Sequence, residues 1–175
     1  AWSLFVYFPL AHWIWGGGWL AQLGVWDFAG GIVIHTSAGM AAIAAGLVFG
    51  RRKNYGPQIM VPHNLPLAVI GATMLWLGWF GFNAGSALAA NGVAGNALLT
   101  SQIGAATCTL VWLFLSWKRS GKPSIAAVIN GAISGLAGIT PTAGYITGES
   151  AFVLGIILGF GSYYGIVLLK EKLRI

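Results

Sequence analysis

Residues 65–90 read LPLAVIGATMLWLGWFGFNAGSALAA, a stretch without a single charged side chain. A helix needs about 20 predominantly apolar residues to cross the hydrocarbon core of a bilayer, so this stretch is long enough for one span. Four further runs meet the same standard: 28–49, 97–117, 124–142 and 150–169. A sixth run, 1–15, is shorter, and we expect it to be part of an incomplete span.

The composition of the whole chain agrees with a membrane protein. Hydrophobic residues make up 57% of the 175 residues and charged residues only 7%, which leaves too little polar surface to cover a water-exposed globule. Open strands would leave backbone groups unsatisfied in lipid, and the sequence lacks the ten-residue alternation of a barrel. We therefore predict an all-α, polytopic transmembrane helix bundle, with residues 1–175 forming one incomplete transmembrane domain.

The basic residues predict the orientation of this bundle. They form three clusters: Arg51, Arg52 and Lys53; Lys118, Arg119 and Lys122; and Lys170, Lys172 and Arg174. The clusters follow the second, fourth and sixth runs, and the alternate connections carry no basic residue, so loops 51–64, 118–123 and 170–175 are expected in the cytoplasm. Basic residues placed between apolar runs are not the footprint of a nucleic-acid-binding protein, and no nucleic-acid partner is expected.

The chain is also rich in glycine, with 27 residues. Three pairs lie four residues apart within predicted spans: Gly131/Gly135, Gly155/Gly159 and Gly161/Gly165. Small residues at this spacing permit close approach of membrane helices, so we interpret the pairs as packing sites.

His35 is the ionisable side chain expected deepest in the membrane. It lies eight residues beyond Asp27, which corresponds to roughly 12 Å below the outer surface at 1.5 Å per residue. An ionisable side chain at this depth is a candidate functional residue, although a neutral imidazole bonded to a backbone carbonyl is the structural alternative. Asp27 precedes the helix and suits an N-cap, while its charge could also favour cations at the outer face.

Aromatic and small polar side chains near the outer face form a second group of candidates. Trp79, Phe82 and Ser86 are three and four residues apart, so they share one helix face that rises toward the outer surface. Packing and a serine bonded to its own helix are the common explanations for such residues. Trp15 precedes three glycines, 16–18, which allow a bend or a close approach that an interfacial tryptophan belt does not need.

The sequence lacks the common motifs of enzyme active sites. His12, His35 and His63 lack metal-ligand spacing, and no cysteine or carboxylate joins them. The segment 120–124 lacks the first glycine of a phosphate-binding loop, and no Gly-x-Ser-x-Gly nucleophile elbow occurs. We expect no enzymatic activity, no metal and no cofactor.

Three longer motifs carry a resemblance to a known family. They are Asp27-Phe-Ala-Gly-Gly-Ile-Val-Ile-His35 with Gly50-Arg51-Arg52, then Pro62-His-Asn-Leu-Pro66 with Gly78-Trp-Phe-Gly-Phe-Asn-Ala-Gly-Ser86, and finally Gly138-Ile-Thr-Pro-Thr-Ala-Gly-Tyr145. In this order and spacing they resemble the ammonium transporter (Amt/MEP/Rh) family, and its Amt branch in particular. The resemblance implies an eleven-helix fold of two inverted halves and a homotrimer with one pore per subunit. This chain would run from within the fourth helix to the end of the ninth.

The resemblance also implies roles for individual residues. Trp15 and Ser86 would form the outer ammonium recruitment site, with Asp27 supporting it indirectly. Phe82 would belong to the aromatic gate, His35 would be the first of two paired pore histidines, and Trp79 would line the pore beside them. The helices that supply the second gate phenylalanine and the second histidine are not in this sequence. Ammonium or ammonia, the lipid bilayer of the cell membrane and a regulatory cytoplasmic protein are the implied partners.

The implied function is ammonium transport, in which ammonium is recruited at the outer face, loses a proton and crosses a hydrophobic pore as ammonia. A tryptophan face attracts a cation and a serine oxygen accepts an N–H, whereas a neutral molecule crosses an apolar pore at lower cost than an ion. Whether His35 relays the proton or hydrogen-bonds ammonia stays open. We expect its side chain to converge with Trp79 and Phe82 on one channel.

Three alternatives to a transporter remain open. An ammonium-binding sensor would use the same outer site. A Rhesus-type ammonia channel is expected to lack the Trp15 and Ser86 pair, so the presence of both favours the Amt branch. A purely structural membrane subunit predicts that His35 faces a neighbouring helix instead of a channel.

Overall fold

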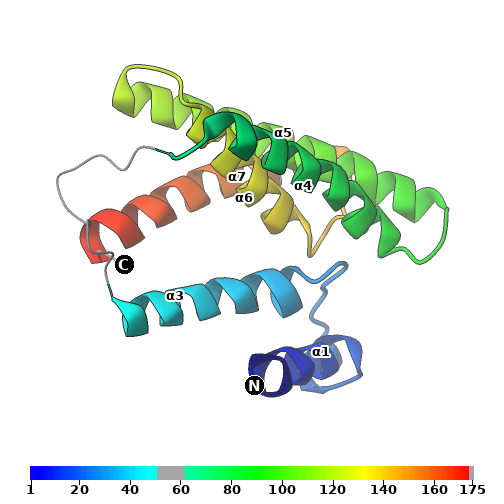
Figure 1. The fold of residues 1–175 in the computed structure, drawn as a ribbon. Helices are drawn as coiled ribbons and strands as arrows, with labels where there is room; N and C mark the ends of the chain where they lie inside the picture. The colour runs from blue at the N-terminus through cyan, green and yellow to red at the C-terminus, as the bar shows by residue number, and fades with distance from the viewer. Residues whose placement is uncertain (51–61, 174–175) are drawn as a thin grey trace.

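The computed structural model describes residues 1–50 and 62–173, and every regular element in these ranges is helical (Figure 1). In chain order they are η1 (Ser3–Tyr7), α1 (Phe8–Trp15), α2 (Trp19–Gln22), η2 (Gly31–Thr36), α3 (Ser37–Phe49), α4 (Leu65–Gly85), α5 (Gly92–Ser120), α6 (Ile125–Ile139), α7 (Gly148–Val167) and η3 (Leu168–Leu173). The elements η1, η2 and η3 are π-helical turns. The first leads into α1, the second leads into α3, and the third extends α7 at its C-terminal end. The predicted all-α fold class is confirmed.

Within the described ranges, four helical segments are long and apolar enough to cross a membrane: Gly31–Phe49, Leu65–Gly85, Gly92–Ser120 and Gly148–Glu171. They correspond to four of the five runs predicted as full spans. The fifth run, 124–142, forms only α6, whose 15 residues reach roughly 22 Å against a hydrocarbon core of about 30 Å. This helix ends early because Pro141 has no N–H to continue the hydrogen-bond ladder.

The packed centre of the described bundle consists of α5, α6 and α7, with α4 against α5 and α6. Glycine allows the helices to approach closely: a Cβ on Gly135 would lie 2.7 Å from Ala105 Cα, and one on Gly155 would lie 2.8 Å from Gly104 O. The predicted packing role is thereby confirmed for two glycine pairs. For Gly161 and Gly165 it stays a prediction, because a Cβ added at either residue would have no atom within 4 Å in the described structure.

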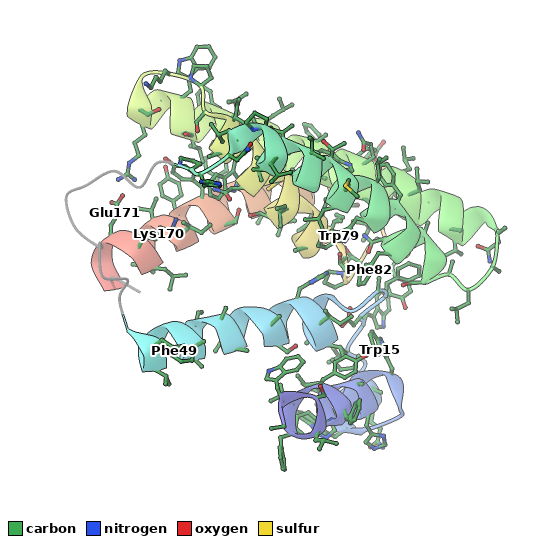
Figure 2. All side chains as sticks on the ribbon, viewed as in Figure 1. Trp15, Phe49, Trp79, Phe82, Lys170 and Glu171 are labelled. Atoms are coloured by element: carbon green, nitrogen blue, oxygen red, sulfur yellow. The ribbon has the colours of Figure 1, made fainter. Side chains whose placement is uncertain are left out.

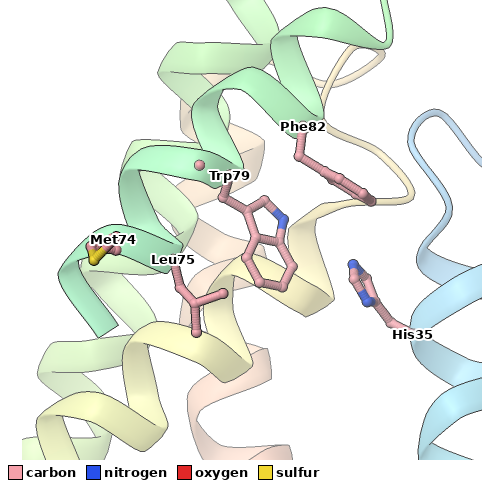
Figure 3. Close-up of a pocket in the computed structure, with 6 residues that line it drawn as sticks. His35, Met74, Leu75, Trp79 and Phe82 are labelled. Atoms are coloured by element: carbon pink, nitrogen blue, oxygen red, sulfur yellow. The ribbon is translucent and has the colours of Figure 1, made fainter. Parts of the chain in front are cut away.

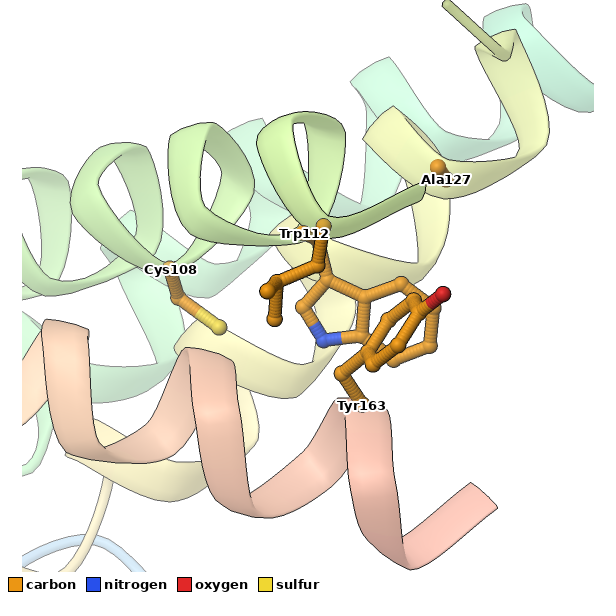
Figure 4. Close-up of a cluster of buried hydrophobic side chains, with 5 residues drawn as sticks. Cys108, Trp112, Ala127 and Tyr163 are labelled. Atoms are coloured by element: carbon orange, nitrogen blue, oxygen red, sulfur yellow. The ribbon is translucent and has the colours of Figure 1, made fainter. Parts of the chain in front are cut away.

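A hydrophobic cluster reinforces the contact between α5 and α7 (Figure 4). Trp112 and Tyr163 meet edge to face with ring centroids 5.0 Å apart, and Cys108, Leu115 and Ala127 complete the cluster beside them. The Trp112 indole N–H donates to Ser162 Oγ at 2.7 Å, which satisfies the polar end of this buried ring. Cys108 thus packs as a small hydrophobe.

The basic end of the bundle is opposite the aromatic end that carries Trp15, Trp79 and Phe82 (Figure 2). The guanidinium of Arg119 donates to both carboxylate oxygens of Glu171 at 2.6 and 2.7 Å, so the second basic cluster, at the end of α5, lies beside the part of η3 that carries Lys170 of the third cluster. The first cluster, 51–53, and Arg174 lie outside the described residues. Two of the three clusters therefore share one end, as the alternation of basic loops predicts.

Candidate functional site

Asp27 organises the start of the helix that carries His35. Its Oδ1 accepts the backbone N–H groups of Gly30 and Gly31 at 2.9 and 2.7 Å, and its Oδ2 accepts those of Ile32 and Val33 at 2.8 and 3.0 Å. These donors have no partner inside the helix, so the carboxylate caps the helix N-terminus. The side chain is only 5% exposed, and both oxygens are committed to the backbone. The N-cap residue itself is Gly30, and the Asp27 carboxylate caps this helix end from three residues before it, which is a structural role.

His35 lies in the π-helical turn η2, where its backbone N–H donates to the carbonyl of Gly30, five residues earlier, at 3.2 Å. A π turn changes the direction in which the following side chains point, and such turns are frequent at functional sites. The imidazole Nε2 is buried and has no hydrogen-bond partner among the described residues. The structural alternative for His35, a bond from the ring to a backbone carbonyl, is thus not observed at this nitrogen.

The rings of Trp79 and Phe82 meet the imidazole of His35 (Figure 3). The His35 ring centroid lies 5.0 Å from that of Trp79 and 5.7 Å from that of Phe82, and the latter two are 5.8 Å apart. Trp79 and Phe82 come from α4, while His35 faces them from η2 across the opening (Figure 3). The predicted convergence of these three side chains is confirmed.

A cavity of about 350 Å³ lies at this meeting point. Its wall is almost entirely apolar and is lined by His35, Met74, Leu75, Gly78, Trp79 and Phe82. The imidazole is the ionisable group in this lining. A small neutral molecule fits such surroundings, whereas an unpaired ion would be costly to hold there.

Thr140 at the end of α6 holds the indole of Trp79. The indole N–H donates to Thr140 Oγ1 at 2.9 Å, and the threonine hydroxyl donates to Leu136 O at 2.7 Å. Thr140 belongs to the motif 138–145, but the sequence alone predicted no role for it. The one sequence feature that pointed to Thr140 was its position directly before Pro141, since a proline interrupts a helix and leaves side chains at the helix end available for other contacts.

Trp15 and Ser86 occupy the aromatic end without a hydrogen bond between them in the described structure. The Trp15 indole N–H donates to the backbone carbonyl of Asp27 at 2.8 Å, and the side chain remains 46% exposed. Ser86 ends α4 and donates its hydroxyl proton to Phe82 O at 2.9 Å, which is the bond to its own helix that is common for serine. The hydroxyl oxygen of Ser86 can still accept a hydrogen bond. The hydrogen bond of Trp15 uses the N–H at the edge of its ring, so it leaves the face of the ring free.

The described part of the chain contains no candidate metal site. Within residues 1–50 and 62–173, no group of three or more His, Cys, Asp or Glu side chains could hold a metal ion.

Residues 1–175 match a family model described as "Ammonium Transporter Family". The chain is 58% identical over 179 residues to "Ammonium transporter 1" of Dictyostelium discoideum, covering 100% of this chain and 38% of that protein. It is 50% identical over 162 residues to "Ammonium transporter Amt1" of Archaeoglobus fulgidus, covering 93% of this chain and 41% of that protein. The chain thus spans about two fifths of the length of the curated relatives it matches.

Solved structures agree with the sequence relatives. The crystal structure of Candida albicans Mep2 superposes with a TM-score of 0.92 at 39% identity, covering 99% of this chain and 39% of that one. A structure named "Sensor Amt Protein" superposes with a TM-score of 0.92 at 32% identity, covering 98% of this chain and 45% of that one.

Proposed function

Since the chain belongs to the ammonium transporter family of multi-pass membrane proteins, we propose that its subunit recruits ammonium at the outer face and conducts ammonia through an aromatic-lined pore. The observation that carries this proposal is the triangle of His35, Trp79 and Phe82 around one apolar cavity. Residues 1–175 are one incomplete part of the transmembrane domain in this scheme, and helices outside the sequence complete the pore.

Recruitment is assigned to Trp15 and Ser86. The exposed indole of Trp15 offers a cation–π surface, and its N–H is already occupied by Asp27 O, so the ring is held while its face stays available. The Ser86 oxygen can accept an N–H of the cation because its own proton is donated to Phe82 O. Asp27 acts indirectly in this proposal, by fixing both Trp15 and the start of the His35 helix.

Below this site the cation must lose a proton. Phe82, Trp79 and the aliphatic wall of the cavity offer no counter-charge to ammonium, whereas ammonia is neutral and small enough to pass. A potassium ion has no proton to lose, so the same wall would discriminate against it. The unpartnered Nε2 of His35 is the atom available to accept a proton or to hydrogen-bond ammonia, and the proposal includes both roles.

The orientation and assembly of the subunit complete the proposal. Loops 51–64, 118–123 and 170–175 are cytoplasmic, a placement supported by the alternation of basic loops and by the ion pair between Arg119 and Glu171. A homotrimer in the cell membrane, and a regulatory cytoplasmic protein at the basic end, are the assembly partners that the family resemblance implies.

A sensor is the second candidate function, because a structure named "Sensor Amt Protein" shares this fold at a TM-score of 0.92. A sensor would bind ammonium at the outer site without sustained flux. A purely structural subunit is disfavoured because His35 lines a cavity and its buried Nε2 has no hydrogen-bond partner among the described residues.

The full-length parent protein, reconstituted in liposomes, decides between these functions. We expect an inward ammonium gradient to drive flux, an equal potassium gradient to drive none, and His35→Ala to reduce selective flux in a protein that still assembles. Ammonium binding without flux in the unchanged protein would favour the sensor. Equal flux and selectivity in His35→Ala would return His35 to a structural role.

A further inference from the structure

The turn after α6 touches both elements that carry the pore rings. The N–H of Phe28, just before η2, donates to Pro141 O at 2.9 Å. Gly31, the first residue of η2, lies so close to the Pro141 ring that a Cβ on Gly31 would overlap it. On the other side, Thr140 receives the indole N–H of Trp79 from α4. Two consecutive residues thus contact the His35 element and the Trp79 element.

The turn itself is fixed by α5. Thr100 Oγ1 donates to Ala143 O at 2.7 Å, and the side-chain amide of Asn96 donates to Ile146 O at 2.9 Å. Thr100 and Ala143 are fully buried, so water does not compete for the bond between them. The turn 140–147 is therefore a rigid platform instead of a free loop.

The hydroxyl of Thr140 has one donor and is fully buried at 0% exposure. Since that proton is directed to Leu136 O, the oxygen faces Trp79 with a lone pair, which matches the indole N–H. Trp79 is only partly buried, and one side of its ring borders the cavity, so packing alone does not fix its tilt. The bond to Thr140 supplies the missing constraint.

We propose that Thr140 is a positioning residue that sets the tilt of Trp79 against His35, so that the turn after α6 determines the spacing of the pore rings. The proposal rests on the proposed function for its effect on flux. Its structural part, a directed bond from the Trp79 indole to Thr140 that fixes the ring, is independent of transport.

The test uses the full-length protein with three variants. Thr140→Val keeps the shape of the side chain and removes the acceptor, whereas Thr140→Ser keeps the hydroxyl. Thr109→Val is the matched control, because the Thr109 hydroxyl donates only to Ala105 O in its own helix. We expect Thr140→Val to lower maximal ammonium flux roughly threefold to tenfold, the equivalent of one lost hydrogen bond, with an unchanged half-saturating concentration. Thr140→Ser and Thr109→Val should remain near the unchanged protein.

A double-mutant cycle of Thr140→Val with Trp79→Phe distinguishes the positioning of Trp79 from a general loosening of the turn after α6. Phenylalanine has no indole N–H, so Thr140→Val should have no further effect on flux in the Trp79→Phe protein. Independent losses that multiply in the double variant would overturn the proposal, as would full flux in Thr140→Val.

A spectroscopic measurement keeps the inference testable apart from transport. The Trp79 contribution to the ultraviolet resonance Raman spectrum is isolated by subtracting the Trp79→Phe spectrum, and its N–H-sensitive band should shift in Thr140→Val but not in Thr109→Val. Thr140→Ala, which removes the same acceptor with less bulk, should give the same shift if Thr140→Val does not assemble. An unshifted band refutes the positioning role even in a conducting protein. A parent protein without flux refutes the proposed function while this band still decides the inference.

Discussion

Replacing Asp27 by asparagine distinguishes a helix cap from a cation attractor. The carboxylate accepts four backbone N–H groups, two on each oxygen, at 2.7 to 3.0 Å. An asparagine keeps one oxygen and places an NH₂ group against the other two donors, which then face a donor instead of an acceptor. The perturbation thus removes half of the cap and almost no volume.

The expected loss of stability follows from the number of donors left unpaired. Each buried N–H without a partner costs about 1–3 kcal/mol, so two of them predict a loss of roughly 2–6 kcal/mol in the free energy of unfolding. The site cannot relieve this cost with water, since Asp27 is 5% exposed and Gly30, Gly31 and Val33 are buried. An ordinary N-cap replaced by alanine costs only about 0.5–2 kcal/mol.

The assay is thermal unfolding of the purified full-length protein, with ammonium uptake measured at low and high concentration. We expect Asp27→Asn to lower the unfolding temperature clearly, and to lower uptake at both concentrations in proportion to the folded fraction. The reasoning is refuted if Asp27→Asn unfolds at the temperature of the unchanged protein and loses uptake only at low ammonium. That pattern would mean that the charge of Asp27 attracts the cation and does not cap the helix.

Three further predictions concern the outer site, the orientation and the packing. Trp15→Leu and Ser86→Ala should each raise the half-saturating ammonium concentration more than they lower maximal flux. The lost cation–π contact at Trp15 should weaken ammonium binding by about 0.5–2 kcal/mol. Equal losses of uptake at low and high ammonium would count against a recruitment role. Lys122→Cys should resist an impermeant thiol reagent in intact cells and react after permeabilisation, and rapid labelling of intact cells would reverse the orientation. Gly135→Leu should abolish assembly as seen by size-exclusion chromatography, because its side chain would meet the backbone of α5, whereas Gly161→Leu, with open space around it, should assemble normally.

The helical membrane class could be predicted from the sequence because it depends on local properties. Run length decides whether a helix can cross lipid, and the absence of water forces the backbone to bond within each helix. The three-residue spacing of Trp79 and Phe82 likewise determines that they share a face, since helical geometry repeats along a single segment. His35 was identifiable as a candidate because an ionisable group within an apolar run is rare.

Other features depend on contacts between segments far apart in the chain. The 5.0 Å separation of His35 and Trp79, and the bond from Trp79 to Thr140 across 61 residues, follow from how η2, α4 and α6 pack. No periodicity along the chain encodes these distances. The same limit applies to Gly161 and Gly165: spacing shows that two glycines share a face, but not which face meets a neighbour, and that face is open within the described structure.

The sequence by itself therefore determined the class of this protein, the length of most spans and the side chains that share a helix face, because each is settled within one helix. The structure decided that the Asp27 carboxylate is bonded locally to the N-terminus of the His35 helix, and only tertiary packing decided that Thr140 accepts the indole N–H of Trp79. A carboxylate before a helix can face either water or backbone, and a threonine at a helix end can bond many partners. The choice is made by the partners that packing brings within hydrogen-bond distance.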